Sequence, residues 1–237
     1  MILKQVSLTT KSLRIRTLHL AFACLFVLNC GMAQAALEAP SGLQSGDEYR
    51  LVFVTSGFHN AASSNISDYN SYVQNAADAV GSLVSGTGMT WRAIASTGTV
   101  DARDNTFTNP SIDGIGVPLY RVDGIRIANN YNDLWDGAIQ NALNVTELGT
   151  APAIPRGVWT ATAPNGVKAP GLGDPGLMFF GQSPFTDTNW VWSGQNTAAV
   201  EFHVYAISNA LTVVPEPASW VVALLLSLLA SSPRRSR

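Results

Sequence analysis

The chain of 237 residues carries a formal net charge of −2, and its length suits one or two domains. Of its 14 basic residues, four precede residue 36 and three follow residue 217, which leaves seven against all 16 acidic residues and a net charge of −9 in between. This acidic stretch disfavours a nucleic-acid partner, since phosphate binding needs a basic surface, and it suits solubility, divalent cations or basic partners.

The first 35 residues show the three parts of a secretory signal peptide. Basic residues at positions 4, 11, 14 and 16 precede an apolar run over residues 18–28. Ala33 and Ala35 then supply the small-x-small pattern that signal peptidase recognises, so we expect cleavage before Ala36. A lipoprotein signal at Cys30 is the alternative, although Asn29 stands where a small residue is expected.

Both cysteines, Cys24 and Cys30, fall inside this predicted leader. The exported part would then contain no thiol, which excludes a disulfide, a thiolate metal site and a cysteine nucleophile. An exported domain without cross-links depends on its hydrophobic core for stability.

Residues 36–212 are predicted to form one exported α+β domain. Hydrophobic patterning predicts a strand at 48–55 and a helix at 65–80, with Ser64 or Asn65 as the N-cap. Further expected elements are a short helix at 131–142, weakened by Gly137, and strands at 90–100, 158–161, 190–192 and 199–208. We therefore expect a single loop-rich mixed domain with a small, mainly antiparallel sheet and one or two helices, flanked by an N-terminal signal helix and a C-terminal hydrophobic helix.

Residues 213–237 combine three features in order. Pro215, Glu216 and Pro217 form a motif that proline keeps extended. Residues 218–232 carry no charge and would span about 22 Å as a helix, less than the roughly 30 Å of a bilayer core. The terminal arginines favour a cytoplasmic C-terminus and an external N-terminus, and they are Arg234, Arg235 and Arg237. A buried core helix with a basic tip is the alternative.

This order of Pro-Glu-Pro, short hydrophobic segment and arginine cluster resembles the PEP-CTERM sorting signal of Gram-negative bacteria. The resemblance implies a precursor exported through the inner membrane and anchored there by residues 218–232. Signal peptidase and an exosortase would be its processing enzymes, and the cell surface or extracellular matrix its destination. Whether the tail is cleaved or kept as an anchor stays open.

The predicted domain carries weaker resemblances. TWRAIASTGTVDARDNT and HVYAISNALTVVPEP are similar to segments of PEP-CTERM ectodomains of unknown function. VWTATAPNG followed by NWVW resembles C-type-lectin-like domains. The chain lacks the disulfides and sugar motifs of that family, so its calcium and sugar binding do not carry over.

Residues 101–105 form the densest polar cluster. Two carboxylates could serve acid–base catalysis or bind calcium through oxygen ligands, so Asp101, Asp104 and Asn105 are weak metal candidates. We favour a local ion pair in which Arg103 neutralises one or both aspartates. The sequence supports no specific metal site.

His203 lies in the predicted strand 199–208, where alternation places Glu201 and Tyr205 on the same face. A Glu–His pair could orient the imidazole for catalysis, and a half-solvated strand face explains the pattern equally well. No hydrolase or zinc motif accompanies it.

Trp190 and Trp192 lie two residues apart beside a glycine-rich segment. They could stack on a carbohydrate while Asp187 and Asn189 supply hydrogen bonds. Core packing is the commoner fate of tryptophan.

Together these patterns favour a non-enzymatic exported protein that acts as a structural or polysaccharide-associated module without a cofactor. The alternative is an exported hydrolase that uses Asp101, Asp104 or His203.

Overall fold

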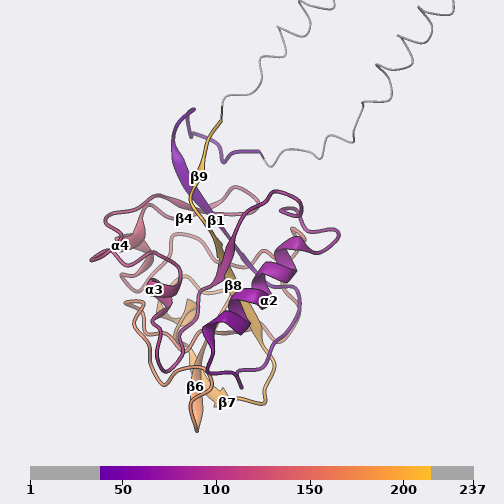
Figure 1. Cartoon of the computed structure of the whole chain (residues 1–237), viewed down its shortest axis with the longest axis vertical. Helices are drawn as coiled ribbons and strands as arrows, with labels where there is room; N and C mark the ends of the chain where they lie inside the picture. The colour runs from indigo at the N-terminus through magenta and orange to yellow at the C-terminus, as the bar shows by residue number, and fades with distance from the viewer. Residues whose placement is uncertain (1–37, 215–237) are drawn as a thin grey trace, which may run out of the picture. The chain divides into compact units, whose positions relative to one another are not determined.

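A computed structural model describes residues 38–214 of the chain (Figure 1). The predicted signal peptide, the Pro-Glu-Pro motif and the predicted membrane segment lie outside these residues. Among residues 38–214, no helix has the length and apolar character needed to cross a membrane.

The described part contains three α-helices, a 3-10 helix and nine strands, with the helices interspersed among the strands. In order they are β1 (Glu48–Val54), α2 (Ile66–Asp78), β2 (Trp91–Ala93), α3 (Ala102–Asn105), β3 (Leu119–Arg121), β4 (Arg126–Ala128), α4 (Tyr131–Leu134), β5 (Gly157–Trp159), β6 (Leu177–Gln182), η1 (Thr188–Trp190), β7 (Gly194–Thr197), β8 (His203–Ser208) and β9 (Leu211–Thr212). The α+β class predicted from the sequence is confirmed.

All nine strands join one mixed sheet in the order β4-β3-β1-β8-β5-β6-β7, with β2 paired to β8 and β9 paired to β1. The β1–β3 and β5–β8 pairs are parallel, whereas the other pairs are antiparallel. The prediction of a small sheet is therefore wrong. It fails because β3, β4, β6 and β7 are short or irregularly patterned, and their pairing depends on distant strands rather than on local sequence.

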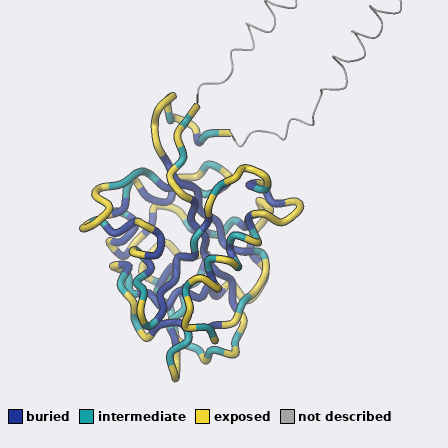
Figure 2. Tube along the Cα trace, viewed as in Figure 1, coloured by how far each residue is buried: buried dark blue, intermediate teal, exposed yellow. Residues whose placement is uncertain are grey.

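The core of the sheet is built on β1 and β8. All six residues of β8 are buried, and so are the six residues of β1 that follow Glu48. Figure 2 shows buried backbone concentrated along these central strands. The strand predicted at 199–208 begins only at His203, and the interpretation of its face as half-solvated is wrong for residues 203–208, which are buried throughout.

Helix α2 follows from its sequence pattern. The side chain of Asn65 caps its N-terminus by accepting a hydrogen bond from the Ser67 amide, as predicted. Tyr69, Val73 and Ala77 recur every four residues and are buried. This face packs against β2 and β8 (Figure 1). The helix leaves Asn70 and Gln74 beside the edge of β2, which positions the site described below.

Three predicted elements are shorter or of another kind. The strand expected at 90–100 ends at Ala93, because the chain turns to begin α3. The helix expected at 131–142 ends at Leu134, shortly before Gly137, whose φ of 104° is left-handed. Residues 190–192 are not a strand, since η1 occupies Thr188–Trp190.

Candidate functional site

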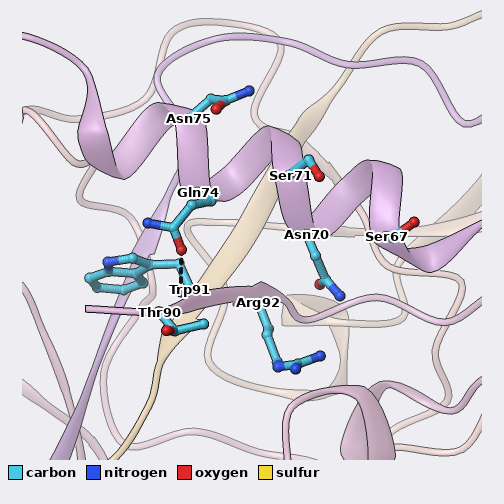
Figure 3. A pocket seen from close by; sticks show the side chains of 8 residues that line it. All are labelled: Ser67, Asn70, Ser71, Gln74, Asn75, Thr90, Trp91 and Arg92. Carbon is cyan, nitrogen blue, oxygen red and sulfur yellow. Dashed lines mark hydrogen bonds between the residues drawn. The ribbon is translucent and has the colours of Figure 1, made fainter. Parts of the chain in front are cut away.

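Helix α2 supplies the hydrogen-bond partners for one edge of β2. The other edge of this strand pairs with β8. Gln74 Oε1 accepts a hydrogen bond from the Trp91 amide at 2.7 Å, and Asn70 Oδ1 accepts one from the Ala93 amide at 2.8 Å. Four helical residues rise about 6.0 Å and two strand residues about 6.6 Å, so the two spacings match. Figure 3 shows Asn70 and Gln74 extending from the helix toward the strand.

Asn105 extends this arrangement to α3. It exchanges two hydrogen bonds of 2.9 Å with Asn70, amide to amide, and its Nδ2 also donates to the Ala93 carbonyl at 2.8 Å. Asn105 is 5% exposed. Because both polar atoms of this side chain are engaged, Asn105 is a structural residue, and its use as a metal ligand would require breaking the pair.

A surface groove of about 400 Å³ runs along this α2–β2 junction (Figure 3). All but one of its lining residues have polar side chains and none is a carboxylate. They are Ser67, Asn70, Ser71, Gln74, Asn75, Thr90, Trp91 and Arg92. Asn70 and Gln74 are fixed by their bonds to β2. Within residues 38–214, the side chains of Ser67, Ser71 and Asn75 have no hydrogen-bond partner.

The free polar groups of this groove come from two elements. Ser67, Ser71 and Asn75 follow one another at intervals of four, which places them in a row along α2. Thr90, which precedes β2, and Arg92, which lies in it, project on the other side of the strand from Asn70 and Gln74 (Figure 3). The arrangement offers hydroxyl, amide and guanidinium groups over a rigid base, which suits a hydroxyl-rich ligand.

The two aspartates of the acidic cluster predicted from the sequence form hydrogen bonds with different parts of the chain. Asp101 Oδ1 accepts from the Lys168 amide at 3.0 Å, and Asp104 Oδ1 accepts from Asn109 Nδ2 at 2.6 Å. The expected ion pair with Arg103 does not form, since the ion pair found within residues 38–214 joins Arg121 to Asp123. No group of three or more metal-ligating side chains gathers in the described part.

His203 is fully buried at the start of β8. Its Nδ1 and Nε2 each lie 3.0 Å from a backbone carbonyl, of Gly57 and Ala153 respectively. Glu201 precedes the strand and is exposed, so the expected Glu–His pair is not formed in residues 38–214. Both ring nitrogens thus face backbone carbonyls, and within residues 38–214 no hydrogen bond or ion pair joins His203 to Asp101 or Asp104.

The predicted aromatic surface splits into two environments. Trp190 is fully buried in the core, so its placement on a ligand surface is wrong. Trp192 is half-buried and stacks on Phe179 of β6, with ring centroids 3.6 Å apart. Asp187 caps η1 by accepting from the Asn189 amide at 3.0 Å and also binds the Asn189 side chain. These two polar groups therefore stabilise a local turn.

Comparison with protein-family models and with curated proteins finds no match to this chain. The residues of the groove are therefore the basis for the function proposed below. Sequence reasoning missed Asn70, Gln74 and Arg92, and the available signal was the spacing of two amides by four residues on the predicted helix.

Proposed function

We propose that this protein is exported, sorted to the cell envelope or extracellular matrix by its PEP-CTERM-like tail, and binds polysaccharide there through the α2–β2 groove. The leader and tail motifs support the destination. The observation that supports the ligand class is the row of unpartnered polar side chains formed by Ser67, Ser71 and Asn75.

Sugar recognition needs hydrogen-bond groups that are free yet already positioned. Free hydroxyl and amide groups exchange bonds with water for bonds with sugar hydroxyls, and each such exchange contributes modestly. Asn70 and Gln74 fix α2 to β2 beneath the groove. Binding therefore costs little conformational entropy of the backbone. The role proposed is therefore binding rather than catalysis.

Binding is tested with protein purified from cells that express the full chain, by calorimetry against a panel of soluble glycans. Replacing Ser67, Ser71 and Asn75 by alanine removes three free polar groups from exposed helix positions, where alanine is the best helix former. We expect affinity to fall about tenfold or more, since three bonds of about 0.5–1.5 kcal/mol are lost.

Asn132→Ala is the matched control, because Asn132 is an exposed amide on the separate helix α4. It should leave affinity unchanged. If the protein binds no glycan of the panel, the polysaccharide role is refuted. If the triple variant and the control bind with equal affinity, the α2–β2 groove is not the binding site.

Sorting is tested separately by placing one tag after residue 36 and another at the C-terminus. Mass spectrometry of the mature protein should give an N-terminus at Ala36 and loss of the residues that follow Pro217. A mature membrane-bound protein that keeps its C-terminal tag would show that residues 218–232 are a permanent anchor.

A further inference from the structure

Phe107 presents an aromatic ring from an unusual backbone turn just after α3. Its φ is 53°, which side chains other than glycine, asparagine and aspartate rarely adopt. The residue is 52% exposed, so hydrophobic burial does not account for the conformation. Backbone strain of this kind persists where surrounding contacts impose it, and it gathers at ligand sites.

The turn ends α3 as a left-handed C-cap, in which the Thr108 amide donates to the Arg103 carbonyl at 2.8 Å, and Arg50 holds this turn from the core. Its guanidinium is buried and donates to the Thr106 carbonyl at 2.6 Å and to the Phe107 carbonyl at 3.2 Å. Both bonds are charge-assisted, and they anchor the turn to β1 in the centre of the sheet. The Phe107 ring is thereby held in place at the surface.

Arg92 joins this ring to the α2–β2 groove. Its guanidinium lies over the Phe107 ring, 4.6 Å from the ring centroid, and Arg92 also lines the groove. Among residues 38–214 it forms no ion pair with a carboxylate. The edge donors of a guanidinium stacked on an aromatic ring remain available for oxygen acceptors, and their fork matches a pair of adjacent oxygens.

We infer that Phe107 and Arg92 together form the end of the groove that grips one sugar ring, and that this ring belongs to a neutral polysaccharide. The inference rests on the proposed function. Because the Arg92 guanidinium covers one face of the Phe107 ring, the C–H groups of the sugar would pack against the exposed edge of the ring, and the edge of the guanidinium beside it would donate to two neighbouring hydroxyls.

The choice of a neutral polymer follows from charge. Residues 36–217 carry a net charge of −9, and the field of such a domain repels a polyanion beyond the contact itself, over a screening length of roughly 8–10 Å. A single guanidinium does not reverse that field. Hydroxyl groups experience no such repulsion.

The test compares two ligands and four variants, again with protein from cells that express the full chain. The ligands are a neutral glucan oligosaccharide and the same oligosaccharide with its primary alcohols oxidised to carboxylates. We expect the neutral form to bind at least about tenfold more tightly at low salt. Phe107→Gly and Arg92→Met should each weaken it about tenfold, Phe107→Trp should retain it, and Phe185→Ala, a second exposed phenylalanine, should leave it unchanged.

Phe107→Gly also separates binding from folding. Glycine adopts positive φ without strain, so the thermal midpoint should stay the same or rise while affinity falls. Neutral binding that survives both Phe107→Gly and Arg92→Met would overturn the inference and leave the proposed function standing. Equal or tighter binding of the oxidised ligand would overturn the neutral assignment. Binding of neither ligand would overturn the inference, and the proposed function falls with it only when no glycan of the panel binds either.

Discussion

Asn70→Ala is the sharpest test of the packing between α2 and β2. The substitution removes the oxygen that accepts a hydrogen bond from the Ala93 amide. It also removes the two hydrogen bonds that join the side-chain amides of Asn70 and Asn105. Ala93 is fully buried and Asn105 nearly so, so an amide hydrogen and a side-chain oxygen lose their partners inside the protein. Asn105 Nδ2 keeps its bond to the Ala93 carbonyl.

The magnitude follows from these two unpaired groups. Each buried polar group without a partner costs about 1–3 kcal/mol, and alanine returns about 0.5 kcal/mol through its higher helix propensity. Asn70 is half-buried beside an open groove. Water can therefore reach the unpaired groups, and the cost of each lies near the lower end of this range. We expect a net loss of about 2 kcal/mol in the free energy of unfolding, which is a large part of a typical total of about 5–15 kcal/mol.

Urea denaturation of the full chain measures this loss. With a slope of about 2 kcal/mol per molar urea, the midpoint should fall by about 1 M. Ser71→Ala, one residue along the same helix at an exposed position without side-chain bonds, should change stability by less than about 0.5 kcal/mol. Indistinguishable midpoints for Asn70→Ala and Ser71→Ala would refute the account of the amide pairs. In a double-mutant cycle, Asn70→Ala and Asn105→Ala should also be non-additive by at least about 0.5 kcal/mol.

Three further predictions concern the core and its ionisation. Trp190→Ala should cost about 3–5 kcal/mol because the side chain is fully buried, whereas the half-buried Trp192→Ala should cost clearly less, and thermal denaturation distinguishes them. Gly181→Ala should destabilise by at least about 1–3 kcal/mol, since the added methyl group would overlap the Trp190 carbonyl oxygen; a midpoint equal to that of the unmodified protein would contradict this. Burial raises the pKa of Tyr69 from 10.0 to about 12, so its stabilising effect is complete below pH 10 and is lost as pH rises to about 12. Urea midpoints between pH 9 and 12 should therefore fall less steeply in Tyr69→Phe, and identical slopes would contradict the assignment.

The elements that sequence predicted best are those that local pattern determines. Helix α2 has an N-cap and a four-residue apolar repeat, and β1 has a continuous run of strand formers. By contrast, β3 and β4 have three residues each and exist because β1 offers β3 a parallel partner. Such strands carry almost no local signal, since their stability comes from a neighbour that is distant in the chain.

The candidate site was hidden for the same reason. Asn70 and Gln74 look like part of a solvated helix face until β2 is placed beside them. Trp190 and Trp192 look equivalent in sequence, yet the turn of η1 sends one into the core and leaves the other half-exposed. Which polar or aromatic side chain is free to bind a ligand is decided by its neighbours in space.

Phe107 shows how far this dependence reaches. Phenylalanine has no intrinsic preference for positive φ, so no sequence rule places it in a left-handed turn. The turn closes the end of α3, and Arg50, 57 positions earlier, holds it by donating from a buried guanidinium to the Phe107 carbonyl. These contacts together leave the Phe107 ring exposed beside Arg92. The hydrogen bonds of a core residue thus affect the position of a side chain at the surface. Substitution of Arg50 should therefore perturb the Phe107 ring as well as the fold.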